Sequence, residues 1–492
     1  MISADIRKKY TPTIGIECHV QLKTKTKLFS AVDNDAREAP SNTLVSHIDF
    51  GLPGALPVFN KEALHLASKA AFALGTEPQK FSKFDRKHYF YPDLPMGYQI
   101  TQFDEPIILG GEVMVEVDGV NKKIGITRAH MEADAGKSTH PEGKDFSLVD
   151  LNRAGTPLLE IVSEPDMHSA AEAKAYAREL YLRMRYADVS DCNLYYGNMR
   201  FDVNVSVSTD ASKMGTRSET KNLNSFRAVE KAIEYEINRQ IELLEKGEII
   251  VQETRGWHDT KQKTFSQRTK ENADDYRYMP DPDLPPLQID DEYINTVKAE
   301  MPVMPAEWRD KLKQLGLDDS QSDTLLEAQL DDEQVKYLEL IEQNLQEKEF
   351  AKQLSNWFVN IEIPLRNDEK VRNTQDNDAR LAFYKALYDL VKAGKLSSTN
   401  AKTLVTDIFA SDAYPADLAK HAEEQGFIQV SDEGEIATIV EQVLSDNAKA
   451  AEDVKNGEMK AIGFLVGQVM KASKGKANPG LAQQLIKKQL GI

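Results

Sequence analysis

Apolar and polar residues alternate along short segments in the first half of the chain, as they do in strands that bury one face. Between Ile14 and Leu22 the even positions are apolar and the odd positions are polar, apart from Gly15. A later segment, 200–208, has four apolar side chains on one face: Phe201, Val203, Val205 and Val207. We predict two half-buried strands, each turning a polar face toward a cleft or solvent.

Helical periodicity follows the second of these segments. Apolar residues recur at three- and four-residue steps from Phe226 to Leu244, with Ser225 as N-cap and Gly247 as terminator. This pattern predicts an amphipathic helix packed on the sheet. The last helix is predicted to open at Asn478, an N-cap that is followed by a proline at the first helical position.

The fold class that follows is α+β with a helical region after it. The proline-rich segment 280–286 interrupts both patterns, because proline lacks a backbone donor and restricts its neighbour. Beyond about residue 296 the helical pattern dominates. We predict three domains: an α+β domain over 1–295, a helical domain over 296–410 and a small helical domain over 411–492.

The composition is that of a soluble globular protein, with 41% hydrophobic and 28% charged residues among 492. No apolar run approaches the ~18 residues of a membrane span, and the first residues lack the apolar stretch of a signal peptide, so we expect a cytoplasmic protein. Its two cysteines, Cys18 and Cys192, are too few for a disulfide framework or an all-cysteine zinc site.

Charge is distributed unevenly along the chain. The net charge of -18 argues against non-specific binding to nucleic acid. Residues 301–350 carry 5 basic and 13 acidic side chains, whereas residues 459–492 hold six lysines and no acid. Three of these lysines surround a predicted glycine-containing turn, which either rests on a phosphate backbone or is simply solvated: Lys471, Lys474 and Lys476.

Three familiar catalytic motifs are absent. The segment 135–139 imitates the end of a P-loop, but Met131 stands where that motif needs glycine. Cys18 beside His19 invites a thiol nucleophile, yet neighbouring side chains on a strand point to opposite faces, so Cys18 is predicted to be a core residue. Cys192 has no histidine near it in the sequence, and no Gly-x-Ser-x-Gly turn occurs.

Four residues suggest a divalent metal site. Glu17 and His19 share the polar face of the first strand, Glu160 interrupts the apolar run 158–162, and Glu132 ends another predicted strand. Buried carboxylates that lie together repel unless a cation bridges them, and oxygen ligands with one histidine suit Mg²⁺ or Mn²⁺. The other interpretation, separate surface or hydrogen-bonded groups, is the one that spacing alone favours.

Two further segments each allow two interpretations. The segment 84–99 concentrates cations and aromatic residues, which is typical of a surface that stacks a base and holds phosphate, or of packing at a domain edge. The polar run 219–225 leads into a helix N-terminus, where it either offers donors to anionic oxygens or only caps the helix.

Taken together, these motifs resemble the B subunit of the tRNA-dependent aspartyl/glutamyl amidotransferase. The segments that carry the resemblance cover nearly the whole chain: 14–22, 84–93, 130–138, 150–160, 221–226, 274–278 and 463–471. The resemblance implies a cradle domain related to the catalytic fold of glutamine synthetase, followed by a helical domain and a small helical tail that contacts tRNA.

The resemblance also implies a ligase activity. Members of this family use ATP to phosphorylate the side-chain carboxylate of Glu on tRNA(Gln) or Asp on tRNA(Asn), and ammonia then displaces phosphate to give the amide. The ammonia comes from an amidase-like glutaminase A subunit, and a small C subunit completes the heterotrimer. The lack of a glutaminase nucleophile in this chain agrees with that division of labour.

By position, the family's metal-binding and catalytic residues fall on Glu17, His19, Glu132 and Glu160. The resemblance further implies an ATP-binding cleft lined by five residues: Arg200, Asp202, Asn204, Lys221 and Asn222. Expected cofactors are ATP and Mg²⁺ or Mn²⁺. Many members carry a four-cysteine zinc element around the region that here spans 28–54, but this chain has no cysteine there, so no structural zinc is expected.

Two other hypotheses stay open at this point. In one, the chain is a non-catalytic subunit that docks tRNA through its basic tail, and the acidic residues are structural. In the other, it is an independent carboxylate-amine ligase for a small substrate, which leaves the basic tail without a role.

Overall fold

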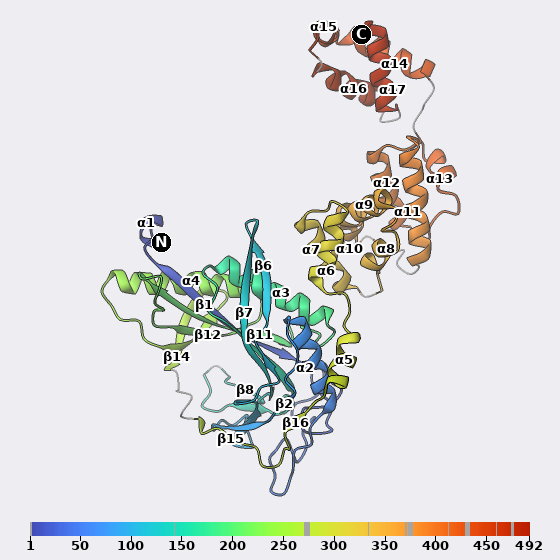
Figure 1. The fold of residues 1–492 in the computed structure, drawn as a ribbon. Helices are drawn as coiled ribbons and strands as arrows, with labels where there is room; N and C mark the ends of the chain where they lie inside the picture. Colours follow the sequence, from blue (N-terminus) through green and yellow to red (C-terminus); the bar gives the residue numbers. More distant parts are fainter. Residues whose placement is uncertain are drawn as a thin grey trace. The chain divides into compact units, whose positions relative to one another are not determined.

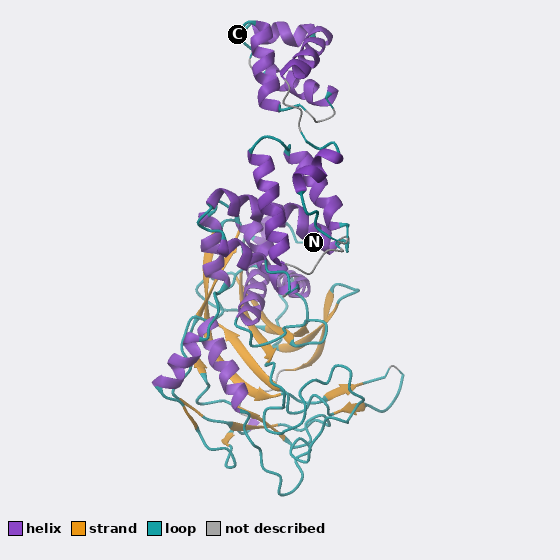
Figure 2. Ribbon diagram, turned by 90° about the vertical axis from the view of Figure 1, so that its right-hand side faces the viewer, coloured by secondary structure: helices purple, strands orange, loops and turns teal. Residues whose placement is uncertain are grey.

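The structure, a computed structural model, describes residues 2–492 except 142, 270–275, 333, 370, 372–376, 412, 429–432, 459 and 474–476. The chain forms two compact units, Met1–Pro305 and Ala306–Ile492. Within the described ranges the strands belong to the first unit and the second unit is helical (Figure 2). The predicted α+β class is confirmed.

One large sheet forms the base of the first unit. Its 12 strands, counted over the described residues, are β1 (Thr11–Gln21), β3 (Asp85–His88), β4 (Tyr98–Thr101), β5 (Ile108–Leu109), β6 (Glu112–Val117), β7 (Val120–Ala133), β10 (Pro157–Ser163), β11 (Met199–Ser208), β12 (Ser218–Leu223), β13 (Glu253–His258), β14 (Lys263–Thr269) and β15 (Met279–Pro280). Their order is β14-β13-β12-β11-β1-β10-β7-β4-β3-β15, with β5 and β6 paired on β7. Two small ribbons pair β2 (Phe81–Ser82) with β16 (Leu287–Gln288), and β8 (Lys137–Thr139) with β9 (Leu148–Asp150).

Helices cover one face of this sheet. Figure 1 shows α3 (Ala170–Tyr186) and α4 (Phe226–Glu245) along one side of the central strands, and α4 packs on β11. The apolar residues of β1 that face this layer are fully buried, or nearly so: Ile14, Ile16, Cys18 and Val20. Since alternate residues of a strand point to opposite faces, the polar residues of the same strands turn away from the helices.

Local signals place these elements where the sequence predicted them. Ser225 caps α4 by accepting a hydrogen bond from the backbone N–H of Ala228 at 3.0 Å, and Gly247 follows the helix with a φ of 74°. Along β11 the four predicted apolar residues are buried. The remaining helices of the first unit are α1 (Ala4–Arg7), α2 (Lys61–Ala73) and α5 (Asp291–Ala299).

The second unit consists of helices. They are α6 (Pro305–Gln314), α7 (Asp319–Asp331), α8 (Tyr337–Gln343), α9 (Lys348–Trp357), the π-helix η2 (Phe358–Glu362), α10 (Ile363–Asn367), α11 (Asn377–Lys392), α12 (Ser398–Phe409), α13 (Leu418–Glu424), α14 (Glu433–Asp446), α15 (Ala448–Lys455), α16 (Ala461–Ala472) and α17 (Pro479–Leu490). Apolar residues of α14 to α17 share a core of their own. Asn478 caps α17 as predicted, by accepting from the backbone N–H of Leu481 at 3.1 Å.

The border between the units lies about ten residues after the predicted one. Helix α5 belongs to the first unit because its apolar residues Ile294 and Val297 are buried there and it packs on α2. The further division near residue 410 stays a prediction. In the part of the chain that the structure describes, no helix has the length and apolar character needed to cross a membrane.

Candidate active site

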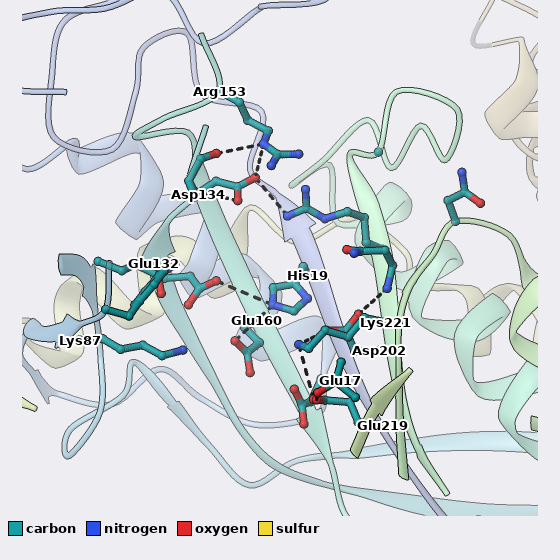
Figure 3. A pocket seen from close by; sticks show the side chains of 18 of the residues that line it. Glu17, His19, Lys87, Glu132, Asp134, Arg153, Glu160, Asp202, Glu219 and Lys221 are labelled. Atoms are coloured by element: carbon teal, nitrogen blue, oxygen red, sulfur yellow. Dashed lines mark hydrogen bonds and ion pairs between the residues drawn. The ribbon is translucent and has the colours of Figure 1, made fainter. Parts of the chain in front are cut away.

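A cavity of about 730 Å³ opens on the polar face of the sheet. Strands β1, β7, β10, β11 and β12 supply most of its charged lining, and the close-up in Figure 3 shows these side chains converging from neighbouring strands. Its described lining includes six carboxylates: Glu17, Glu132, Asp134, Glu160, Asp202 and Glu219. Such a concentration of negative charge requires cations nearby.

The first group of ligands, the histidine cluster, consists of His19, Glu132 and Glu160. The strand register brings it together, because Glu160 on β10 lies directly opposite His19 on β1 and opposite His130 on β7. The Nε2 atom of His19 lies 3.3 Å from Oε2 of Glu160 and 3.8 Å from Oε1 of Glu132. The Nε2 atom of His130 lies 3.6 and 3.7 Å from the same two carboxylates. Two imidazoles therefore lie within ion-pair distance of two carboxylates.

Electrostatics in this cluster favour a positive charge at its centre. Burial opposes protonation of His19, but the hydrogen bond and charge of Glu160, together with the nearby carboxylates, raise the pKa of His19 to about 9. Burial disfavours the charged form of Glu160 and so acts to raise its pKa. The nearby cations His130, His19 and Lys87 outweigh this effect and hold the pKa of Glu160 well below its usual range. The negative charge of the two carboxylates thus favours a cation at this cluster.

The second group, the carboxylate cluster, consists of Glu17, Asp202 and Glu219. Asp202 on β11 lies directly opposite Glu17, and one oxygen from each of the three carboxylates lies within 4.8 Å of the others. The ammonium of Lys221 lies 2.8 Å from Asp202 and 3.5 Å from Glu219. Burial and the negative charge of Glu160 raise the pKa of Glu17. Burial also acts to raise the pKa of Asp202, but Lys221 beside it lowers that pKa.

Further cations complete the cavity. Arg200 donates to Asp134 at 3.1 Å, and Arg153 lies 3.2 Å from the same carboxylate oxygen. The Lys87 ammonium lies 4.8 Å from the ring centroid of Tyr276. Burial opposes the charge of Lys87, but Glu132 and other neighbours raise its pKa. Among the described residues no carboxylate oxygen lies within 4.0 Å of this ammonium, which leaves it able to contact an anionic ligand.

The structure separates the four residues of the predicted metal site into two neighbouring groups. His19, Glu132 and Glu160 lie together, whereas Glu17 lies in the carboxylate cluster, and all four line the same cavity. The reason is that Glu17 faces Asp202 across β1 and β11, while His19 faces Glu160 across β1 and β10.

Four of the five predicted ATP-binding residues line the cavity: Arg200, Asp202, Lys221 and Asn222. The fifth, Asn204, is not among the lining residues, and its amide nitrogen donates to Glu17 at 2.9 Å. The backbone N–H of Asn222, whose φ is 59°, donates to Asp202 at 2.8 Å. Asn204 and Asn222 therefore help to fix the carboxylates of the second cluster.

The predicted tRNA-binding lysines fall in the second unit. Lys471 is exposed in the last turn of α16. Lys474 and Lys476 lie outside the described residues. Cys18 is fully buried among apolar residues, as predicted, and Cys192 is buried in a loop. The segment that imitates a P-loop is not one, because residues 137–139 form strand β8, where a P-loop would begin a helix.

Several residues in or beside the cavity were not predicted from the sequence. His130 and Glu132 are two positions apart on one strand face, which is a signal that could have assigned His130 to the cluster. Glu219 enters the sequence prediction only within the polar run 219–225. Within the segment 84–99, Lys87, Tyr89 and Gln99 line the cavity. That placement favours the ligand-binding interpretation of this segment over simple packing at a domain edge.

The chemistry available here is charge neutralisation and positioning. The described lining contains no serine or cysteine, so no hydroxyl or thiol nucleophile of those types faces the cavity. Each cluster offers three ligand atoms of the kinds that Mg²⁺ and Mn²⁺ accept. Transfer of a phosphoryl group relies on such positioning and charge stabilisation more than on covalent catalysis.

Comparison with known proteins gives one consistent result. Residues 12–295 match the GatB/GatE catalytic domain, and residues 339–490 match the GatB domain. The chain is 44% identical over 484 residues to the B subunit of the aspartyl/glutamyl-tRNA(Asn/Gln) amidotransferase of Thermoanaerobacter pseudethanolicus, covering 98% of this chain and 99% of that one. Proteins with the same name from Bdellovibrio bacteriovorus and Desulfotalea psychrophila are 43% and 42% identical, with the same coverage.

Proposed function

The chain belongs to the family of aspartyl/glutamyl-tRNA(Asn/Gln) amidotransferase B subunits, and from this membership and the charged cavity we propose that it is a ligase subunit acting on misacylated tRNA. Its substrates are ATP and the side-chain carboxylate of Glu on tRNA(Gln), of Asp on tRNA(Asn), or of both. Its products, with ammonia as the nitrogen donor, are Gln-tRNA(Gln) and Asn-tRNA(Asn).

The proposed reaction has two steps. A carboxylate oxygen of the aminoacyl side chain attacks the γ-phosphorus of ATP, the bond from that phosphorus to the β,γ-bridging oxygen breaks, and ADP leaves. Ammonia then attacks the carbonyl carbon of the acyl phosphate, inorganic phosphate departs with the electron pair of the C–O bond, and the nitrogen loses a proton. The ammonia comes from glutamine hydrolysis in an amidase-like A subunit, and a small C subunit completes the complex.

Divalent ions fit the two clusters. We assign Mg²⁺, or Mn²⁺ in its place, to the histidine cluster and to the carboxylate cluster, because each group brings three suitable ligand atoms within 4.8 Å of one another. Bound there, the ions neutralise the triphosphate and the attacking carboxylate, which otherwise repel each other. Lys87 and Arg200 add the positive charge of their own side chains to the cavity. Lys221 and Asn222 hold the carboxylate cluster in place for ATP through their hydrogen bonds to Asp202.

The proposed function also assigns a role to each domain. We assign the first unit to a cradle related to glutamine synthetase, residues 296–410 to a helical domain and residues 411–492 to a tail that contacts tRNA through the lysines near Lys471. Because misacylated tRNA is made and consumed where translation occurs, we place the reaction in the cytoplasm.

One observation supports the proposal most strongly: six carboxylates, His19 and five cationic side chains line one cavity. It is tested by measuring tRNA-dependent ATP hydrolysis in the complex reassembled with the A and C subunits. Glu132→Gln and Glu17→Gln should each lower turnover by about 10²-fold or more, since each removes a charge aimed at the reacting groups. Glu242→Gln, at an exposed position on α4, is the matched control.

The same assay tests the tRNA-docking alternative. If the chain only docked tRNA, this subunit would bind tRNA but would have no affinity for ATP. Substitutions at Glu17 and Glu132 would then leave the turnover of ATP unchanged. Undiminished turnover in both cavity variants would exclude the clusters from the mechanism.

A further inference from the structure

Strands β12 and β13 of the large sheet run parallel, and the chain crosses from one to the other through helix α4. The pairing sets Thr254 on β13 directly against Glu219 on β12, and both side chains line the cavity of the candidate active site. Figure 3 shows Glu219 at the same end of this cavity as Glu17 and Asp202. The strand pair therefore places a threonine beside one member of the carboxylate cluster.

A buried hydrogen bond joins these two side chains. The hydroxyl of Thr254 donates to Oε2 of Glu219 at 3.1 Å, and the two residues are 2% and 3% exposed. The other carboxylate oxygen of Glu219, Oε1, lies 3.5 Å from the ammonium of Lys221. One contact on each oxygen restricts the rotation of a side chain that otherwise has three rotatable bonds. Because an ionised carboxylate has about four acceptor positions, Glu219 can keep both contacts and still bind an ion.

Contacts on the helix-covered face hold the same two strands together. There the fully buried Glu236 of α4 accepts from the hydroxyl of Ser218 at 2.7 Å and lies 3.0 Å from Nε of Arg255. Ser218 precedes Glu219 on β12, and Arg255 follows Thr254 on β13. Neighbouring residues of a strand point to opposite faces, so this clamp lies behind the Thr254–Glu219 contact. The clamp does not use the Thr254 hydroxyl, and the strands should therefore stay paired when that hydroxyl is removed.

We propose that Thr254 is a positioning residue for the carboxylate cluster: its hydroxyl holds Glu219 in the orientation in which that carboxylate binds a divalent ion. This inference rests on the proposed function, since it deepens the assignment of Mg²⁺ or Mn²⁺ to this cluster. Hydrogen bonds to a ligating carboxylate orient it, and the loss of such a partner costs about 10- to 100-fold in metal affinity or activity. A threonine that only filled space would act through its methyl group, which valine also has.

A titration with Mn²⁺ tests this role without catalysis. Free Mn²⁺ gives an electron paramagnetic resonance signal that is lost on binding, so the full-length chain is titrated in the absence of ATP and tRNA. Thr254→Val should weaken binding at one site by about 10- to 100-fold, whereas Thr254→Ser, which keeps the hydroxyl, should bind like the wild type. Thr220→Val is the matched control and should also bind like the wild type. Thr220 is fully buried on the opposite face of β12, and its hydroxyl has no hydrogen-bond partner within the described part of the chain.

The Mg²⁺ dependence of turnover tests the same role in the complex reassembled with the A and C subunits. In Thr254→Val the Mg²⁺ concentration that gives half-maximal tRNA-dependent ATP hydrolysis should rise by about 10- to 100-fold. At saturating Mg²⁺ the kcat of this variant should return to near the wild-type value, because the site is then filled. A general defect in folding would instead lower turnover at every Mg²⁺ concentration, so this dependence separates positioning of a ligand from a merely structural role.

The outcomes separate this inference from the proposed function. Equal or tighter Mn²⁺ binding by Thr254→Val would overturn the inference, as would a wild-type chain that binds no Mn²⁺. Binding that is weakened to the same extent in Thr254→Ser would also overturn it, because the hydroxyl would then not be the cause. If the wild-type complex shows no tRNA-dependent ATP hydrolysis, the proposed function fails, and the Mn²⁺ titration still decides whether Thr254 supports metal binding.

Discussion

Replacing Lys221 by methionine should make the first unit depend on a divalent ion for its stability. Lys221 is the cation that contacts the carboxylate cluster, at 2.8 Å from Asp202 and 3.5 Å from Glu219. Methionine keeps much of the length and apolar stem of lysine but removes the charge. The variant therefore leaves three carboxylates together, of which Asp202 and Glu219 are each 3% exposed.

The structure gives the size of the effect. Two unit charges 4.8 Å apart repel by about 3.5 kcal/mol at an effective dielectric constant near 20, so the three carboxylate pairs repel by about 10 kcal/mol. At its two distances Lys221 attracts by about 6 and 5 kcal/mol, which together slightly exceed that repulsion. Relaxation and water entry reduce the measured cost of losing one partner of a buried pair to about 3–5 kcal/mol.

Differential scanning calorimetry of the full-length chain measures this cost. With an unfolding entropy of about 2.1 cal/mol/K per residue, a unit of this length should melt about 5–8 °C lower in the Lys221→Met variant, in EDTA. Added Mg²⁺ should raise the melting temperature of the variant more than that of the wild type, because a dication replaces the missing charge. Lys213→Met, at an exposed ion pair, is the control and should change little. Equal melting temperatures in EDTA, or an equal response to Mg²⁺, would refute the reasoning.

Three further predictions concern single side chains. Lys87→Met should lower the turnover of tRNA-dependent ATP hydrolysis by about 10²–10³-fold with little change in KM for ATP, and Lys87→Arg should recover part of it, because a cation facing the reacting groups is lost and then restored. Burial acts to raise the pKa of Glu236, but hydrogen bonds from Arg239 and neighbouring hydroxyls hold it below its usual range. Glu236 therefore stabilises the fold above the ordinary carboxyl pKa of about 4.3 and loses this contribution as the pH falls through its lowered value. In urea unfolding, Glu236→Gln should cost about 3–5 kcal/mol near pH 7 and progressively less below about pH 4. Cys18→Val should leave the turnover of tRNA-dependent ATP hydrolysis unchanged, since the thiol is fully buried on the helix-covered face, and a loss of activity would reopen the thiol mechanism.

Local patterns predicted the elements well because the forces that set them are local. Alternation of apolar and polar residues defines the buried face of β1 and β11, and the caps of α4 and α17 are side chains within three residues of the N–H groups they satisfy. The border between the units lies later than the pattern predicts, because the burial of α5 depends on its contact with α2, more than two hundred residues earlier in the chain.

These local patterns could not predict which strands lie next to each other in the sheet. β1 lies between β10 and β11, which follow it by about 140 and 180 residues, and no local signal identifies such partners. The sequence therefore indicated acidic residues that need a cation, but not that Glu17 faces Asp202 while His19 faces Glu160. Tyr195 had no signal in the sequence, since only the fold places this exposed tyrosine at the cavity.

The register that builds the histidine cluster is fixed by apolar packing on the other face of the sheet. The row His19, Glu160 and His130 crosses β1, β10 and β7. The adjacent row on the same three strands is Cys18, Ile161 and Ala129, and all three are fully buried. A slip of one residue would exchange these rows and place charged groups in the core, at a cost of several kcal/mol for each unpaired charge. The position of the candidate metal ligands is therefore held by residues that line the opposite face of the sheet.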